Sequence, residues 1–173
     1  MPFDWHPRDR PEPGKRMITI RQVAADDWRT WREMRLNALR DAPDAFRTKL
    51  ADWLGTGDLE PRWRARLAAV PFNVIADLDG MPAGMVSAVH QGDEVELISM
   101  WVAPFARGRG VGDALVDAVI GWEAVERSGR VVLCVMEGND HAAALYRRHG
   151  FVDAGRPEDA IAGECAECRM IRL

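Results

Sequence analysis

The sequence predicts an α/β fold organised around a mixed β-sheet, and three observations support this prediction. Two apolar runs at 72–78 and 81–90 are joined by Asp79-Gly80, a dipeptide favoured in the tight turns of antiparallel hairpins. A further apolar run at 94–102 leads into a glycine-rich segment where a helical pattern begins. That helix is followed by a continuously apolar run at 131–136, and a strand-helix-strand order makes the two flanking strands parallel.

Length and composition suit one globular domain. The chain has 173 residues, of which 47% are hydrophobic and 29% charged, and no apolar run reaches the ~18 residues of a membrane span. Residues 1–16 contain four prolines and mixed charge but no apolar core, so they resemble neither a signal peptide nor a membrane anchor. We therefore expect a proline-rich extension at 1–16, a single domain at 17–173, a cytoplasmic location and no membrane partner.

The net charge bears on the class of binding partner, and the cysteine spacing bears on metal binding. The net charge of −4 and the scattered arginines argue against a nucleic acid, and they are compatible with an anionic cofactor and a cationic or neutral substrate. Cys165 and Cys168 form a C-x-x-C pair, but no second Cys or His pair has the spacing of a zinc site, and Cys134 lies in an apolar run. We expect no metal and three reduced, structural cysteines.

The N-terminal half begins with a strand and continues with helices. Residues 17–23 alternate as in a short strand, and a helix is expected from about 27 to 40. The apolar stripe of this helix is Trp28, Trp31, Met34 and Ala38. A short helical or irregular piece follows at 45–54, and then a helix at 59–69 with Pro61 in its first turn. These pieces are candidates for the cover of a pocket.

The C-terminal half predicts two further helices and a closing pair of strands. In 111–125 apolar residues recur at i, i+3, i+4, i+7 and i+8, which is typical of a helix packed against a sheet. Asn139 precedes a short helix that runs through His149 and ends at Gly150. The segments 151–154 and 165–173 have the pattern of paired strands.

The segment Arg107-Gly108-Arg109-Gly110-Val111-Gly112 carries the clearest chemical signal. Its glycines lack Cβ atoms where the backbone turns toward a ligand, and the free N–H groups of the helix start that follows point into the same space. The helix dipole and the arginines add positive potential, so a phosphate or pyrophosphate is the expected guest. An ordinary strand-to-helix turn is the alternative. A dinucleotide fingerprint would need glycine in place of Asp113, and the chain has no P-loop Gly-Lys-Ser/Thr.

Together these features resemble the GNAT family of acyl-CoA-dependent N-acetyltransferases. The loop at 107–112 matches the family signature Gln/Arg-x-x-Gly-x-Gly/Ala at a strand-to-helix junction. A second family element is an Asn before a short helix that carries a tyrosine and ends in Gly-Phe. It is matched by Asn139, Ala143, Tyr146, Gly150 and Phe151. The resemblance covers about 17–173, and it implies a mostly antiparallel sheet with helices on both faces and one parallel strand pair that splays apart.

The resemblance implies acetyl-CoA as co-substrate and points to the residues that bind it. Backbone amides of the loop would hold the pyrophosphate, and backbone groups at the end of the 94–102 strand would bind the pantetheine arm. Tyr146 is the chain's only tyrosine and stands where the family places the acid that protonates the departing thiolate. Asn139 would contact the arm or cap its helix. The cofactor-binding residues implied in this way are Met100, Trp101, Val102, Arg107, Gly108, Arg109, Gly110, Val111, Gly112, Asn139 and Tyr146.

A general base for the amine is expected on the strand before the loop. Glu94 and Glu96 lie two residues apart and so project from one face of that strand. Glu96 is the preferred catalytic residue, because some family members carry a glutamate at this distance from the loop. Other members use only water, and Ser99 and His90 are weaker alternatives.

The reaction expected from the resemblance is direct attack of a primary amine on the thioester of acetyl-CoA, with a small molecule as the favoured acceptor. A protein or peptide acceptor and a non-catalytic acyl-CoA-binding module are the open alternatives. In this family the segment that here holds Trp28, Trp31, Trp53 and Trp63 lines the acceptor pocket. We expect most of these tryptophans in the core and one or two against the amine. Homodimers are common in this fold, and the sequence leaves that state open.

Overall fold

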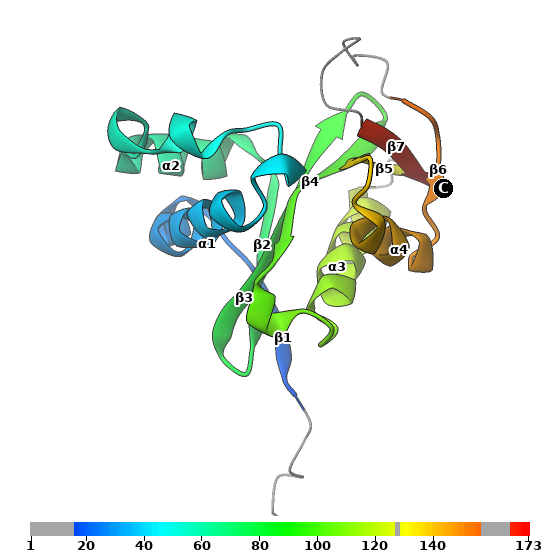
Figure 1. Cartoon of the computed structure of the whole chain (residues 1–173), viewed down its shortest axis with the longest axis horizontal. Helices are drawn as coiled ribbons and strands as arrows, with labels where there is room; N and C mark the ends of the chain where they lie inside the picture. The colour runs from blue at the N-terminus through cyan, green and yellow to red at the C-terminus, as the bar shows by residue number, and fades with distance from the viewer. Residues whose placement is uncertain (1–15, 127–128, 157–166) are drawn as a thin grey trace, which may run out of the picture.

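The computed structural model describes residues 16–126, 129–156 and 167–173 of the chain (Figure 1). Almost all of the predicted N-terminal extension, and Cys165 of the C-x-x-C pair, lie outside the described residues. Within these ranges the chain forms a seven-stranded sheet with the order β1-β2-β3-β4-β5-β7-β6. Of the strand pairs in this sheet, β4 and β5 run parallel and all others run antiparallel. The predicted mixed, mostly antiparallel sheet is confirmed.

The first four strands form an antiparallel meander. They are β1 (Ile18–Gln22), β2 (Phe72–Leu78), β3 (Met81–Gln91) and β4 (Glu94–Val102). The predicted hairpin joins β2 to β3, and its two turn residues, Asp79 and Gly80, have φ angles of 51° and 83°. Two consecutive residues with positive φ are the mark of a tight hairpin turn, which is why an Asp-Gly pair favours it.

The remaining three strands continue the sheet beyond β4, and the sheet opens between β4 and β5. They are β5 (Val131–Met136), β6 (Val152–Asp153) and β7 (Glu167–Arg172). β5 pairs with β4 at two positions, Val95 with Val131 and Glu96 with Val132. On its other side β5 pairs with β7 along its whole length. Residues 97–102 of β4 therefore have no strand partner on the side of β5, and the expected splay is confirmed.

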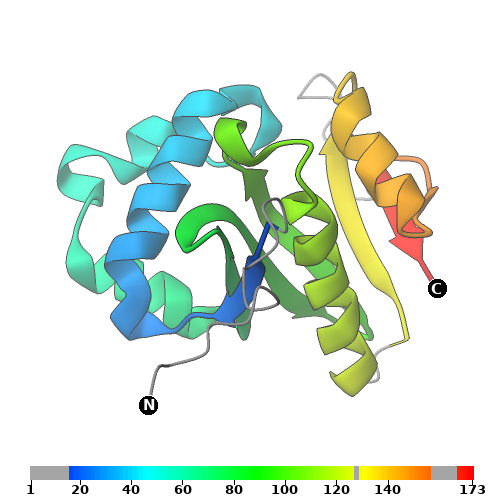
Figure 2. The same ribbon diagram turned by 90° about the horizontal axis from the view of Figure 1, so that it is seen from below.

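Helices cover both faces of the sheet, as Figure 2 shows. One face carries α1 (Trp28–Asp41) and α2 (Glu60–Ala69), linked by 3₁₀ turns at Pro43–Ala45, Leu50–Trp53 and Gly55–Gly57. The other face carries α3 (Val111–Glu126), with α4 (Asp140–Arg148) beside it. None of the helices in the described part of the chain is both long enough and apolar enough to cross a membrane.

The alternation of side chains along the central strands divides the core into two layers. On β2, Val74 belongs to the apolar cluster under α3, and its neighbour Ile75 belongs to the cluster under α1 and α2. Close packing of α3 on β3 depends on Gly84, because a Cβ there would lie 2.9 Å from Val111 Cγ1 and 3.1 Å from the Trp101 carbonyl oxygen. This contact holds the first turn of α3 against the end of β4.

Candidate active site

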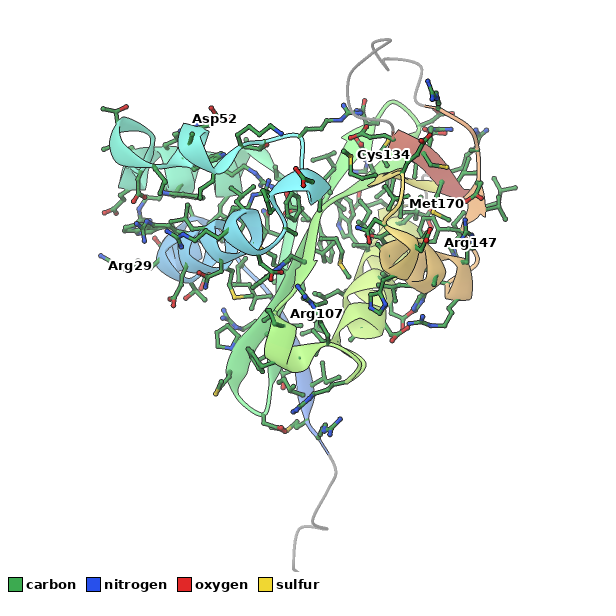
Figure 3. The ribbon with its side chains drawn as sticks, in the orientation of Figure 1. Arg29, Asp52, Arg107, Cys134, Arg147 and Met170 are labelled. Atoms are coloured by element: carbon green, nitrogen blue, oxygen red, sulfur yellow. The ribbon has the colours of Figure 1, made fainter. Side chains whose placement is uncertain are left out.

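Two cavities meet at the middle of β4. The larger, of about 880 Å³, lies where β4 and β5 separate, between the start of α3 and the start of α4. The smaller, of about 360 Å³, lies between β4 and the layer of α1 and α2. Figure 3 labels two residues that line the larger cavity, Arg107 beyond the end of β4 and Cys134 on β5. The residues that line both cavities are Ala45, Phe46, Leu97, Ile98, Ser99 and Cys134.

The glycine loop forms one end of the larger cavity. Gly108 and Gly110 have φ angles of +67° and +87°, a conformation that L side chains rarely adopt, so glycine is needed for this turn. The Ala114 amide donates to the Gly110 carbonyl over 3.0 Å, so the amides before Ala114 lack acceptors within α3. These amides and the positive end of the helix dipole have the geometry of the anion site that the sequence predicts, and that site stays a prediction.

The six residues of this loop are not equivalent. Arg107, Gly108, Gly110 and Gly112 line the larger cavity. Arg109 and Val111 are not among its lining residues: the side chain of Arg109 is exposed, and that of Val111 is fully buried in the core. Val111 can therefore serve a bound anion only through its backbone amide, whereas Arg109 also carries a positive charge near the loop, as the sequence analysis expects.

The guanidinium of Arg107 is occupied by protein groups. Its Nε donates to the Val102 carbonyl oxygen over 3.1 Å, and its Nη2 pairs with the Asp41 carboxylate. The same carboxylate accepts a hydrogen bond from Trp101 Nε1 over 2.9 Å. The hydrogen bond from Trp101, together with Arg107, holds the pKa of Asp41 below its usual value. Asp41 thus ties the last turn of α1 to the loop, a role that the sequence analysis missed.

The side of the larger cavity formed by β4 offers backbone groups. Met100, Trp101 and Val102 all line it, as the sequence predicts. At this end of β4 the strand pairs only with β3. A β-bulge interrupts that pairing between Ile98 and Trp101, opposite the stretch between Met85 and Ser87. Within this bulge Ser99 has a φ of +56°, which is uncommon for a residue other than glycine. The bulge and the missing partner leave polar backbone atoms of β4 facing the cavity.

The opposite side of the larger cavity is formed by α4. Asn139 caps this helix, because its Oδ1 accepts from the Ala142 amide over 3.3 Å, and it also lines the cavity. Tyr146 lines the same cavity while its ring packs edge-on against Phe151 at 5.8 Å. Burial raises the pKa of Tyr146 above its ordinary value, so the phenol is protonated at neutral pH. A protonated hydroxyl in this place can donate a proton.

The two histidines near Tyr146 have different surroundings. His141 lines the larger cavity. His149 lies against α3 instead, with Nε2 2.9 Å from Asp113 and Nδ1 3.1 Å from Asp117. That contact joins α4 to α3 and gives His149 a structural role.

The two candidate bases on β4, Glu96 and Glu94, have different surroundings. Glu96 is half-buried and lines the smaller cavity, where its Oε2 accepts from Gln91 Nε2 over 3.0 Å. The carboxylate of Glu94 pairs with Arg169 at 2.6 Å and with Arg130 at 3.5 Å, and it lines neither cavity.

The weaker alternatives also differ in position. The ring of His90 packs against Trp122 of α3 at 5.0 Å, on the face of the sheet away from the smaller cavity. Ser99 lines both cavities. The structure thus brings Glu96 and Ser99 to the site and leaves Glu94 and His90 outside it.

Aromatic rings enclose the smaller cavity. Trp31, Trp53 and Trp63 line it together with Phe46, whereas Trp28 does not. Trp31 and Trp63 are fully buried, and Trp53 packs on Trp63 with ring centroids 4.3 Å apart. Three of the four tryptophans from the expected acceptor segment therefore face the cavity; Trp31 and Trp63 belong to the core, and the partly buried Trp53 packs against it.

The smaller cavity is also lined by two arginines that the sequence analysis missed, the buried Arg35 of α1 and the half-buried Arg66 of α2. Desolvation lowers the pKa of each guanidinium to about 10, and the charge of Arg66 adds to the shift of Arg35. Both remain protonated at neutral pH. A signal was available, because Arg35 lies four positions after Trp31 and Arg66 three positions after Trp63, which places each arginine on an apolar helix face.

The described residues contain neither a cluster of metal ligands nor a disulfide. No group of three or more His, Cys, Asp or Glu side chains within them is arranged to hold a metal ion. Cys134 and Cys168, the two cysteines among the described residues, form no disulfide.

Known proteins resemble this chain in sequence. The model of the Acetyltransferase (GNAT) family matches residues 23–151. A mycothiol acetyltransferase of Clavibacter michiganensis is 30% identical over 147 residues, which are 84% of this chain and 45% of that protein. A putative ribosomal N-acetyltransferase, YdaF of Bacillus subtilis, is 31% identical over 58% of this chain and 57% of its own length. The chain spans about half the length of the curated relatives it matches.

Solved structures resemble the chain in fold. The PaiA N-acetyltransferase of Thermoplasma acidophilum, in complex with coenzyme A, has a TM-score of 0.70 at 15% identity. The match covers 90% of this chain and 98% of the other. The ribosomal-protein-S5-alanine acetyltransferase of Vibrio fischeri has a TM-score of 0.72 at 13% identity, covering 90% of this chain and 92% of its own. At this level of identity the likeness shows a shared fold.

Proposed function

The chain belongs to the acetyltransferase (GNAT) family, and from this premise we propose that it transfers the acetyl group of acetyl-CoA to the primary amine of a small molecule. The meeting of the two cavities at Ile98, Ser99 and Cys134 is the observation that supports this function most directly. The larger cavity offers an anion site and a buried phenol, and the smaller offers a carboxylate. A thioester at their junction could be reached by an amine from the opposite side.

The larger cavity suits the donor. The amides at the start of α3 would bind the pyrophosphate, and the unpaired backbone of 97–102 would hydrogen-bond the pantetheine arm. At Gly112 a Cβ would have little room, because it would lie 3.1 Å from Leu145 Cδ2. The glycines, which carry no side chain, thus let the backbone of the loop and a ligand approach each other.

The chemistry requires a neutral amine, a stabilised oxyanion and a proton for the leaving thiolate. Glu96 would take a proton from the ammonium group, directly or through water. The amine nitrogen would then attack the carbonyl carbon, with backbone N–H groups of β4 available to the oxyanion. The C–N bond forms and the C–S bond breaks, and Tyr146 would deliver its proton to the sulfur. The proton that the nitrogen loses as it becomes an amide would return to the Tyr146 phenolate through water, which restores the enzyme.

The first test measures release of the coenzyme A thiol from acetyl-CoA with a panel of small primary amines, using Tyr146→Phe as the variant. We expect turnover with at least one small amine, and a loss of about 100-fold in kcat for the variant, the lower range of a missing general acid. Acetyl-CoA affinity should stay the same, because phenylalanine keeps the ring that packs on Phe151. Unchanged turnover would remove Tyr146 from the mechanism.

The same panel separates the alternatives. Turnover limited to peptides would replace the small-molecule acceptor with a protein acceptor. Tight acetyl-CoA binding with no thiol release for any amine or peptide would indicate a non-catalytic binding module. The size of the acceptor cavity, about 360 Å³, supports the small molecule.

A further inference from the structure

Arg35 is a buried cation without an ion-pair partner among the described residues. Its residue surface is 8% exposed, and its Nη1 has no hydrogen-bond acceptor in the described part of the chain. No carboxylate of a described residue forms an ion pair with it. Its guanidinium lies over the ring of Phe46, 4.5 Å from the centroid, and it lines the smaller cavity. A face-on aromatic ring compensates only part of the cost of removing a charge from water.

Arg66 lies in the same cavity and has only neutral acceptors. Its Nη1 donates to Asn73 Oδ1 over 3.1 Å, and its Nη2 donates to Ser87 Oγ over 3.2 Å and to Ser99 Oγ over 3.4 Å. These hydrogen bonds fix the direction of the guanidinium but leave its charge uncompensated. Arg66 is close enough to Arg35 for their repulsion to lower the pKa of Arg35.

Two other arginines of the same helices have carboxylate partners. Arg32 of α1 pairs with Asp58, and Arg64 of α2 pairs with Asp26 at 2.6 Å and with Glu60 at 2.7 Å. The remaining arginines, Arg29, Arg40 and Arg62, form no ion pair with a described residue, but they are exposed and water compensates their charges. Arg35 is the buried arginine of these helices, so its missing partner is the most costly one, which points to an anion that enters with the ligand.

The carboxylates of the cavity have other partners. Glu167 pairs with Arg47 at 2.5 Å, and Glu96 accepts from Gln91. Trp53, which also lines the cavity, has a buried Nε1 without an acceptor in the described residues. Around this cavity the unsatisfied buried atoms are thus donors, and a ligand with acceptor oxygens would satisfy them.

We propose that the acceptor is an amino carboxylate, such as a free amino acid, whose carboxylate is bound by Arg35 and Arg66. This inference rests on the proposed N-acetyltransferase function and names its substrate class. Ser99 links the two ideas: its Oγ touches Arg66, and it lines both cavities. A carboxylate held at Arg66 therefore lies next to the junction with the donor cavity, so the amine that reacts is one close to the carboxylate. A protein N-terminus has a neutral amide at that position and leaves both guanidinium groups unpaired.

The test compares each of the common L-amino acids with its own primary amide, which has the same side chain and amine but no negative charge. For the best substrate we expect kcat/KM to be about 10- to 100-fold higher for the acid than for the amide, the range of a hydrogen-bonded charge. The amine of the amide is less basic and is more often neutral, so this bias works against the expected result. Equal rates for acid and amide in an active enzyme would overturn the inference and leave the proposed function intact.

A binding measurement decides the question without turnover. The N-acetyl derivative of each amino acid and its N-acetyl amide are titrated into the protein by calorimetry in the presence of coenzyme A. We expect the acid to bind about 10-fold or more tightly than the amide. If no amine is acetylated in any assay, the proposed function fails, and this difference in affinity still confirms or overturns the anion site.

Variants of Arg35 test whether the preference for a carboxylate arises at this residue. Arg35→Gln should raise the KM for the amino acid about 10- to 100-fold with little change in the KM for acetyl-CoA, and Arg35→Lys should restore part of the affinity. Arg64→Gln, which breaks an exposed ion pair on α2, is the matched control and should change neither value.

A stability measurement excludes misfolding as the cause. Arg35→Met removes the unpaired charge but keeps an unbranched side chain, so we expect its melting temperature to rise by a few degrees while the shift caused by the N-acetyl amino acid disappears. A lower melting temperature together with a retained ligand shift would assign Arg35 to structure and overturn its role in binding.

Discussion

The two cavities of the candidate site differ in what builds them. The larger is built mainly from backbone: the loop at 107–112 and the unpaired edge of β4. The smaller is built from side chains of α1, the turns after it, α2 and β4. A backbone site depends on local chain conformation, which a short motif specifies. A side-chain site depends on how distant segments pack, which no short motif specifies.

Positive charge is used differently in the two cavities. Beside the larger one, Arg107 is neutralised by Asp41, so the attraction for an anion comes from amide groups and the helix dipole. Beside the smaller one, Arg35 and Arg66 have no carboxylate partner among the described residues. The donor side thus offers partial charges on the backbone, whereas the acceptor side offers full charges on side chains.

The largest effect is expected for Gly110→Val, which places a branched side chain at a φ of +87°, with Ile18 Cδ1 3.4 Å from the new Cβ. The loop would have to change conformation, and loss of two or more amide contacts to the pyrophosphate should weaken acetyl-CoA binding by at least about 100-fold. Calorimetric titration of acetyl-CoA measures this. Gly121→Ala, in open space within α3, is the control and should bind normally. Normal affinity for Gly110→Val would show that the larger cavity does not depend on its backbone loop.

A smaller effect is expected for Glu96→Gln, which tests the acceptor side. Because the carboxylate would act as the base, kcat/KM should fall about 10- to 100-fold, and the acidic limb of the pH–rate profile should disappear while the KM for acetyl-CoA stays the same. Glu94→Gln, whose carboxylate is engaged by Arg169 and Arg130, is the matched control and should keep that limb. A Glu96→Gln enzyme with the wild-type acidic limb would leave water as the base.

A still smaller effect is expected for Asp41→Asn, because Asp41 connects α1 on the acceptor side to the loop at 107–112 on the donor side. The amide keeps an acceptor for Trp101 Nε1 but loses the charge that holds Arg107. Since Arg107 is partly exposed, we expect the KM for acetyl-CoA to rise only about 2- to 5-fold. Steady-state kinetics measure this, with Asp44→Asn on the following exposed turn as the control. An increase in the KM for the amine alone would place Asp41 on the acceptor side.

The smallest effect is expected for Asp58→Asn, which loosens the acceptor layer without touching either ligand. Arg32 and the Trp63 indole lower the pKa of Asp58 to about 2, so the folded state favours the ionised carboxylate. We expect a loss of about 1 kcal/mol in the free energy of unfolding at pH 7, after allowance for the solvent exposure of Arg32 and Asp58.

The sign of the pH dependence follows from this shift. The contribution of Asp58 is complete above the ordinary aspartate pKa of about 4 and is lost as the pH falls through about 2. Urea unfolding of the wild type and of Asp58→Asn should therefore converge between pH 4 and pH 2. A constant difference in the free energy of unfolding over that interval would show that the charge of Asp58 does not contribute. Asp93→Asn, in an exposed turn, is the control.

Most elements of the fold could be predicted because their signals are local. The Asp79-Gly80 turn, the Asn139 cap and the continuous apolar run of β5 each reflect a preference of a few neighbouring residues. The choice between Glu94 and Glu96 was less certain, since both project from one face of β4. The structure separates them because Arg169 of β7, far away in the sequence, pairs with Glu94.

The sequence by itself determined the proposed donor side: a loop with glycine at 108, 110 and 112, set between a strand and a helix, exposes backbone amides that would bind an anion. Only the tertiary structure decided the acceptor side. Arg35 and Arg66 look like ordinary charged residues of amphipathic helices. They lose much of their contact with water and have no carboxylate partner among the described residues because α1, α2 and β4 close around them. The cost of desolvating a charge depends on neighbours that are distant in the sequence.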